Sequence, residues 1–188
     1  MATSRSGSNT SNRWHRLPPT DLRPWPVAHR PFDEEAFGSW LGRIASRYAL
    51  SISQLWEISQ PGCFPALTNT GWILFAPLPA DTLKIFAALA RVDIGHLARI
   101  QTPSNWMTDR SQLPYCFRCL VVNPVDVTAP RWKQRWLEPD IKVCEEHGND
   151  LEHIPASIPR QAKNMDRLLS NISKYRQRRS EVLRYRRY

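Results

Sequence analysis

The chain reads Cys116-Phe117-Arg118-Cys119 and, after 24 intervening residues, Cys144-Glu145-Glu146-His147. In each motif, two side chains that bind metals are separated by two residues, which places both on one side of a tight turn. Three thiolates and one imidazole from two such turns are a typical tetrahedral ligand set for zinc. Because four protein ligands leave no position for water, these three cysteines and the histidine predict one structural Zn²⁺ and argue against a catalytic one.

The other interpretations of these residues are a disulfide or four unrelated buried side chains. Three cysteines and a histidine cannot form two disulfides, and nothing in the sequence indicates an oxidising compartment. Cys63 lies far from both motifs, and His153 lacks the spacing of His147, so neither is expected to be a ligand. Gly148 follows the second motif and can supply the tight backbone that this turn needs.

Helical periodicity precedes the first motif. From Asp33 to about Ala49 the apolar residues fall on one face of a helix. We expect Asp33, Glu34 and Glu35 in its first turn, where the helix dipole favours negative charge. The residues on the apolar face are Phe37, Trp40, Leu41, Ile44, Ala45 and Tyr48.

Three shorter helices are expected next. Ser51 and Gln54 have the spacing of a capping box and predict a helix over 52–59, with Ile58 among its inward residues. This helix and the preceding one would form a helix-turn-helix-like corner. Asp81 and Asp93 are expected to cap two further helices, at 82–92 and 94–100.

These patterns predict a mainly α-helical protein with a small zinc-ribbon module. Four parts are expected along the chain: a Pro-rich extended leader at 1–31, a helix-turn-helix-like domain of four helices at 32–105, a Cys3His zinc ribbon at 106–158, and a basic C-terminal arm at 159–188. Trp132 and Trp136 alternate with basic residues between the two motifs. We expect both to pack over the zinc, and leave open whether the bases beside them contact nucleic acid.

Positive charge is concentrated at the C-terminal end. The 188 residues carry a net charge of +9, and residues 160–188 hold ten basic and two acidic residues, which leaves +1 for the rest. Helix-spaced apolar residues between 166 and 183 indicate a basic amphipathic helix, although a solvated charged face is the simpler alternative. We expect phosphate contacts to DNA or RNA from Lys174, Arg176, Arg178, Arg179, Arg184, Arg186 and Arg187.

Several functional classes are disfavoured by what the sequence lacks. No apolar run reaches 18 residues, so no membrane-spanning helix is expected, and residues 1–12 lack the apolar core of a secretory signal. The chain contains no GxxxxGK[ST], GxGxxG, HExxH or GxSxG motif, which lowers the expectation of an enzyme.

Three stretches resemble the TniQ family of transposition proteins. Residues 35–45, Glu-Ala-Phe-Gly-Ser-Trp-Leu-Gly-Arg-Ile-Ala, are similar to the opening motif of that family. Residues 115–120 resemble its YCPxCL motif, and residues 143–148 resemble its VCPxHG motif. The chain departs from the pattern at Ala36, Phe117 and Glu145, and it has no further CxxC after the histidine. In length it is similar to the short TniQ proteins of CRISPR-associated transposons.

The resemblance implies a non-catalytic adaptor of the bacterial cytoplasm. Such proteins connect target-site selection to an AAA+ ATPase regulator that recruits the transposase, and in CRISPR-associated systems they also contact the RNA-guided effector. Two alternatives stay open. A stand-alone DNA-binding regulator with a helix-turn-helix and a zinc site is one, although the predicted helix 52–59 carries no Lys or Arg. A zinc-dependent hydrolase, which needs an open coordination position, is the other.

Five residues are candidate contacts to a protein partner. Asp33, Glu34 and Glu35 are expected to form an exposed acidic cluster that meets a basic ATPase surface, unless they only compensate the helix dipole. Trp14 and Trp25 in the leader are candidate anchors for a partner, and packing of both on their own domain is the alternative.

Overall fold

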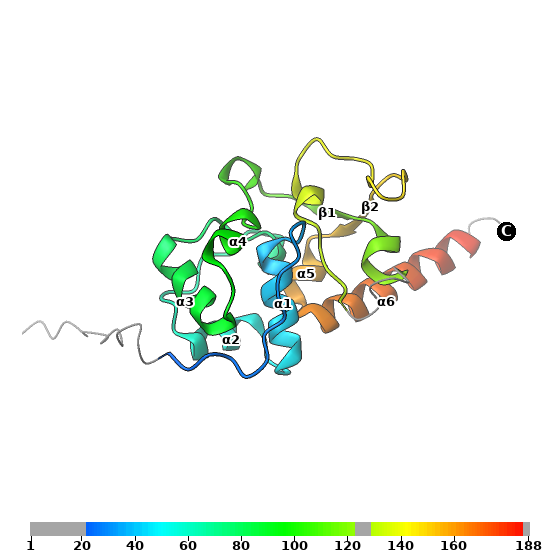
Figure 1. Cartoon of the computed structure of the whole chain (residues 1–188). Coiled ribbons are helices and arrows are strands. Elements are labelled where there is room, and N and C mark those ends of the chain that lie inside the picture. The colour runs from blue at the N-terminus through cyan, green and yellow to red at the C-terminus, as the bar shows by residue number, and fades with distance from the viewer. Residues whose placement is uncertain (1–21, 123–128, 186–188) are drawn as a thin grey trace, which may run out of the picture.

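The computed structural model describes residues 22–122 and 129–185, and within them the protein is mainly helical with one small sheet (Figure 1). The helices are α1 (Phe37–Arg47), α2 (Ile52–Ser59), α3 (Ala80–Ala90), α4 (Ile94–Arg99), α5 (Ser157–Gln161) and α6 (Met165–Tyr185). Short helical turns are η2 (Gly71–Ile73), η3 (Ser104–Trp106), η4 (Arg118–Val122) and η5 (Gln134–Leu137). Strands β1 (Gln112–Tyr115) and β2 (Glu152–Pro155) pair antiparallel, with Pro114 opposite His153. The predicted fold class is confirmed.

Helix α1 lies at the centre of the molecule and begins later than predicted, at Phe37. The expectation that Asp33, Glu34 and Glu35 occupy its first turn is wrong. The backbone before the helix is extended instead, because the Ala36 amide donates to the Trp132 carbonyl at 2.8 Å and Glu35 forms an antiparallel bridge with Lys133. The segment ahead of α1 is therefore held by the chain between the two metal-ligand motifs.

The backbone of η2 lies close to α1 at Gly38. A Cβ placed on Gly38 would come within 1.9 Å of the Trp72 carbonyl oxygen, so only glycine fits there. The Trp72 side chain is buried, and its indole Nε1 donates to the Ala162 carbonyl at 2.7 Å. Trp72 thus connects α1 to the segment between α5 and α6.

The three helices after α1 largely follow the prediction. Ser51 and Gln54 form the predicted capping box on α2, and Asp93 caps α4 by accepting from the His96 amide. Asp81 is not a cap, because α3 begins one residue before it, at Ala80. Ile58, expected to face inward, is 65% exposed because it lies on the outer side of α2.

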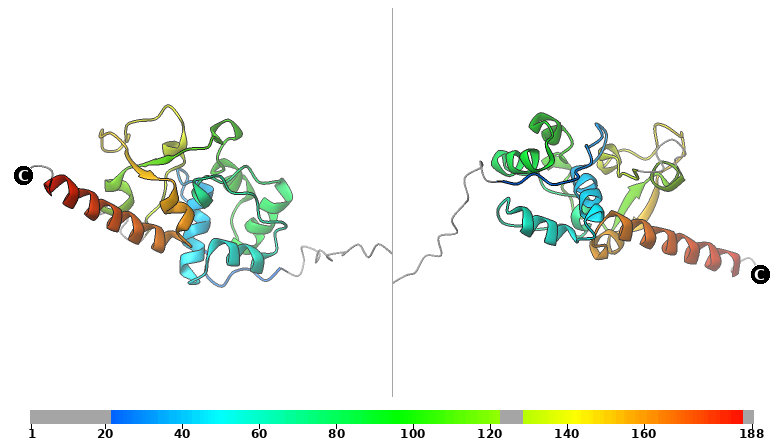
Figure 2. Two further views of the ribbon diagram at one scale, coloured as in Figure 1. Left: turned by 180° about the vertical axis from the view of Figure 1, so that it is seen from behind. Right: turned by 60° about the horizontal axis from the view of Figure 1, so that its bottom comes forward.

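One continuous core joins the helical region, the ribbon and the first half of α6. It contains aromatic residues from α1 and α3, Tyr115 and Trp132 from the ribbon, and Leu168 and Ile172 from α6. Both views in Figure 2 show that the C-terminal part of α6 runs past the rest of the molecule. Among the described residues, no helix has the length and hydrophobicity needed to span a bilayer.

Candidate metal centre

The two predicted ligand motifs meet at one end of the small sheet. Cys116 directly follows β1, and the chain then turns through η4, where the Leu120 amide donates to the Cys116 carbonyl at 3.0 Å. In the second motif the Gly148 amide donates to the Cys144 carbonyl at 2.8 Å. Gly148 has a φ of +61°, a left-handed conformation that favours glycine, which confirms its predicted place in this turn.

The donor atoms of the four predicted ligands are spaced as a tetrahedral zinc ion requires. His147 Nδ1 lies 3.5, 3.3 and 3.6 Å from the sulfur atoms of Cys116, Cys119 and Cys144, and all four donors lie within 4.8 Å of one another. Ideal tetrahedral geometry with Zn–S near 2.3 Å and Zn–N near 2.0–2.1 Å gives S···N separations of about 3.5 Å. The residues present therefore fit a zinc ion bound by three sulfurs and His147 Nδ1.

A bound cation would reduce the electrostatic cost of burying the cysteine thiolates. The three cysteines are buried and His147 is half-buried. Burial raises the pKa of the Cys116 and Cys119 thiols, since an apolar surrounding disfavours a thiolate. A divalent cation at the centre would offset this cost, because it stabilises the deprotonated ligands.

Two tryptophans support the first ligand motif from inside the protein. Trp132 is fully buried and its ring lies 5.8 Å from that of Tyr115, the residue before Cys116, while Trp136 packs edge-on against Trp132 at 6.0 Å. Both are therefore packing residues, and their expected place over the zinc stays a prediction. Sequence alone did not show that the same segment also holds the start of α1.

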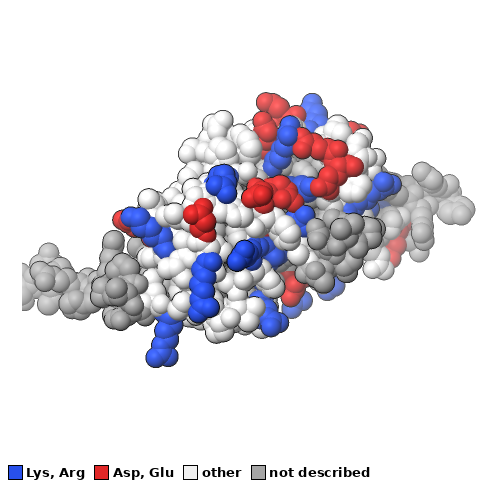
Figure 3. All heavy atoms as spheres, viewed as in Figure 1, with Lys and Arg blue, Asp and Glu red and all other residues white. Residues whose placement is uncertain are grey.

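The basic residues beside these tryptophans are engaged in ion pairs. Arg131 pairs with Glu34, and its guanidinium lies 3.8 Å from the centroid of the Phe32 ring. Lys133 pairs with Glu146, whose other carboxylate oxygen lies 3.0 Å from the Cys119 sulfur. Arg135 pairs with Glu145. Figure 3 shows acidic side chains gathered over this end of the molecule. These pairs argue against a nucleic-acid surface here.

The predicted acidic cluster separates into three different environments. Glu35 is fully buried, so its expected exposure is wrong; it accepts hydrogen bonds from Ser39 and Arg43. Glu34 is half-exposed and pairs with Arg131 at 2.8 Å. Asp33 is the exposed member, with 87% of its side chain accessible, and lies 3.2 Å from His96 Nε2.

The structure describes one of the two tryptophans that were predicted as anchors for a partner. Trp25 is buried, with its ring 6.2 Å from that of Trp40 and 6.0 Å from that of Phe86. It therefore packs on its own domain, and its assignment as an anchor for a partner is wrong. Trp14 lies outside the described residues.

Five of the seven predicted nucleic-acid residues belong to α6. Lys174, Arg178 and Arg179 are exposed, whereas Arg176 is held against the ribbon. Its guanidinium pairs with Glu152 at 3.1 Å and lies 3.3 Å from the centroid of the Phe117 ring, so a phosphate would have to compete with both contacts. Arg184 belongs to α6, and Arg186 and Arg187 lie outside the described residues.

Sequence reasoning missed how α6 is oriented by the metal-ligand motif. The Tyr115 hydroxyl donates to Glu152 at 3.0 Å, and the same carboxylate pairs with Arg176 of α6. Burial, followed by the nearby Glu152 charge, raises the pKa of Tyr115, so the phenol remains a proton donor. Arg176 also stacks on Phe117, between the two cysteines of the first motif, so this part of α6 is in direct contact with the metal centre.

Comparison with known proteins gives one family match. The TniQ family model matches residues 26–151, about two thirds of the chain, and this range includes Glu35, Arg43 and all four candidate ligands. No curated protein matches the sequence.

Proposed function

The chain belongs to the TniQ family and is therefore a transposition-associated protein, and on this premise we propose that it acts as a non-catalytic adaptor. In this role it couples target-site selection, including selection by an RNA-guided CRISPR effector, to an AAA+ ATPase regulator that recruits the transposase. Such an adaptor works where bacterial DNA is, in the cytoplasm. The family match over residues 26–151 carries the proposal.

The geometry of the metal centre supports a structural role in such an adaptor. Four protein donors surround the site, so a tetrahedral Zn²⁺ held by them has no position for a substrate or an activated water. We propose Zn²⁺ as the ion, because three sulfurs and one imidazole are ligands that this ion prefers. When bound, the ion would hold the two ligand motifs together. Because Phe117 of the first motif contacts Arg176, the ion would also help to hold α6 against the ribbon.

The arrangement of the surfaces also supports an adaptor. The helical region and the ribbon share one core, and α6 extends from it with exposed basic residues. A partner bound at the helical end and another bound along α6 would be held at a fixed distance and orientation. That is the physical requirement for connecting two assemblies.

A stand-alone sequence-specific regulator is less compatible with the structure. If α2 were a recognition helix, its outer face would carry donors for base edges and phosphates. The exposed residues of α2 are Ser53, Gln54, Glu57 and Ile58. This face combines one negative charge with an apolar side chain, which suits a protein surface better than a DNA groove.

The experiment that tests the adaptor function is co-purification with an AAA+ ATPase regulator of transposition, with and without ATP and DNA. We expect retention of the ATPase that depends on ATP and DNA. Asp33→Asn is the first variant, because Asp33 is the exposed residue of the predicted acidic contact.

Asp81→Asn is the matched control, since Asp81 is 79% exposed on α3 and has one surface partner, Lys84. Loss of ATPase retention with Asp33→Asn but not with Asp81→Asn would place the contact at the start of α1. Failure of the wild-type chain to retain the ATPase in every condition would contradict the adaptor function.

A further inference from the structure

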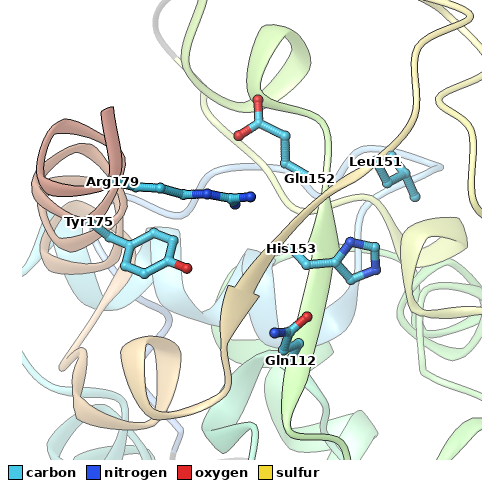
Figure 4. Close-up of a pocket in the computed structure, with 6 residues that line it drawn as sticks. All are labelled: Gln112, Leu151, Glu152, His153, Tyr175 and Arg179. Atoms are coloured by element: carbon cyan, nitrogen blue, oxygen red, sulfur yellow. The ribbon is translucent and has the colours of Figure 1, made fainter. Parts of the chain in front are cut away.

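A polar groove separates α6 from the small sheet. It has a volume of about 410 Å³, and it is lined by Gln112, Leu151, Glu152, His153, Tyr175 and Arg179. Figure 4 shows the side chains of Arg179 and Tyr175 extending from α6 toward the sheet, with Gln112 on the facing strand. Tyr175 and Arg179 are four residues apart, so they lie one above the other on the same face of the helix.

The groove carries positive charge that its own acidic residue does not neutralise. Glu152 Oε2 accepts from the Tyr115 hydroxyl at 3.0 Å and lies 3.1 Å from Arg176 Nε, so this carboxylate is already paired with a different arginine. Arg179 is exposed and makes no ion pair or hydrogen bond with any other described residue. An anion entering the groove would therefore meet a guanidinium without having to displace an existing partner.

The other side chains that line the groove could contact a planar ring bound next to the anion. Tyr175 is half-buried, and its ring extends from the same side of α6 as the Arg179 side chain (Figure 4). Gln112 and His153 are exposed on the facing strands and present donors and acceptors for the edge of a ring. A phosphate bound by an arginine, with a base stacked on an aromatic residue, is the usual mode of contact with unpaired nucleotides.

We infer that this groove binds a nucleotide of a single-stranded nucleic acid, with its phosphate on Arg179 and its base on Tyr175. The inference rests on the proposed function, of which it specifies the nucleic-acid contact. A base inside a duplex is stacked between its neighbours and cannot reach Tyr175. The exposed Lys174 and Arg178 raise the positive potential around the groove, which favours a polyanion over a lone nucleotide.

Binding of labelled 12-nucleotide oligouridylate and oligothymidylate, measured by fluorescence anisotropy, tests this inference. We expect Arg179→Gln and Tyr175→Leu each to weaken binding about fivefold or more, the effect of losing a stacked base or a paired phosphate. Arg179→Gln should also lower the slope of log affinity against log salt by about 0.7.

Two matched controls separate the groove from general charge. Arg178→Gln removes the same charge one residue away and should change affinity by about twofold or less, because it acts only through the long-range potential. Tyr175→Phe retains the ring and should bind like the wild type. Melting temperature and zinc content are measured for each variant, to show that the fold is retained.

Three results would overturn the inference. The first is that Arg178→Gln and Arg179→Gln, tested separately, weaken binding equally while Tyr175→Leu has no effect. This result would indicate that charge alone determines the affinity. The second is equal affinity for a duplex of the same length, and the third is full competition by uridine monophosphate at equal nucleotide concentration. Because ATPase retention does not require the groove, retention without binding of single strands would refute this inference and leave the adaptor function standing.

Discussion

Replacing Glu35 by Gln tests the buried ion pair that fixes the start of α1. The Glu35 carboxylate is fully buried and accepts from Ser39 Oγ at 2.8 Å, from Arg43 Nε at 2.9 Å and Nη2 at 2.6 Å, and from the Phe32 amide at 3.3 Å. Glutamine keeps the shape and one acceptor oxygen but removes the charge. The Arg43 guanidinium, in a residue only 6% exposed, would then keep one further acceptor, the Arg30 carbonyl at 3.0 Å.

The expected loss of stability follows from leaving this guanidinium buried without its counter-charge. Removing one partner of a buried pair costs about 3–5 kcal/mol, and we expect the lower end because the amide oxygen still accepts. With about 2–4 °C of melting temperature per kcal/mol in a chain of this size, Glu35→Gln should melt about 6–12 °C below the wild type. Differential scanning calorimetry measures this shift.

Two further variants show whether the loss of stability comes from the buried charge. Asp33→Asn, two residues away at an exposed position, should change the free energy of unfolding by about 0.5 kcal/mol or less. The double variant Glu35→Gln/Arg43→Met should recover part of the loss, because no unpaired charge remains in the core. A Glu35→Gln protein that melts within 2 °C of the wild type, a margin of about 0.5–1 kcal/mol, would refute the reasoning.

Three further changes test separate parts of the fold. Ser51→Ala removes the capping box of α2 and should cost about 1 kcal/mol of unfolding free energy in chemical denaturation; an unchanged midpoint would contradict the cap. Gly38→Ala places a Cβ 1.9 Å from the Trp72 carbonyl oxygen, so we expect it to cost about 1–3 kcal/mol or more and to lower soluble yield. Arg176→Gln removes the contacts to Glu152 and Phe117, and it should speed amide hydrogen exchange in α6 while leaving α3 unchanged.

Local sequence rules predicted the parts of this protein that local interactions determine. The capping box at Ser51 and the cap at Asp93 involve residues three apart, and the apolar face of α1 follows a period of 3.6 residues. The ligand pairs 116/119 and 144/147 were predicted for the same reason, since the two donors of each pair belong to one turn.

Contacts between residues far apart in the chain could not be predicted in this way. The Arg131–Glu34 pair joins residues 97 positions apart, and no spacing in the sequence marks it. The late start of α1 depends on the bond from Ala36 to the Trp132 carbonyl. Arg176 resembles the other tail arginines in sequence, and only the packing of α6 on Phe117 distinguishes it.

The outward position of Ile58 shows the limit of periodicity in a short helix. In an eight-residue helix such as α2, a single apolar residue on the outer side does not disturb the pattern, so it is easily assigned to the core. The structure places Ile58 outside because Leu55, Trp56 and Ile52 already fill the inner face.

Metal content measured together with thermal stability tests the metal centre most directly. Mass spectrometry of the purified chain should find one zinc per molecule, and a strong chelator should release it and unfold the ribbon. Cys144→Ser should lose the metal and its stability, whereas Cys63→Ser, at an exposed thiol outside the cluster, should keep both. A metal-free chain that melts at the same temperature as the zinc-loaded one would contradict the account.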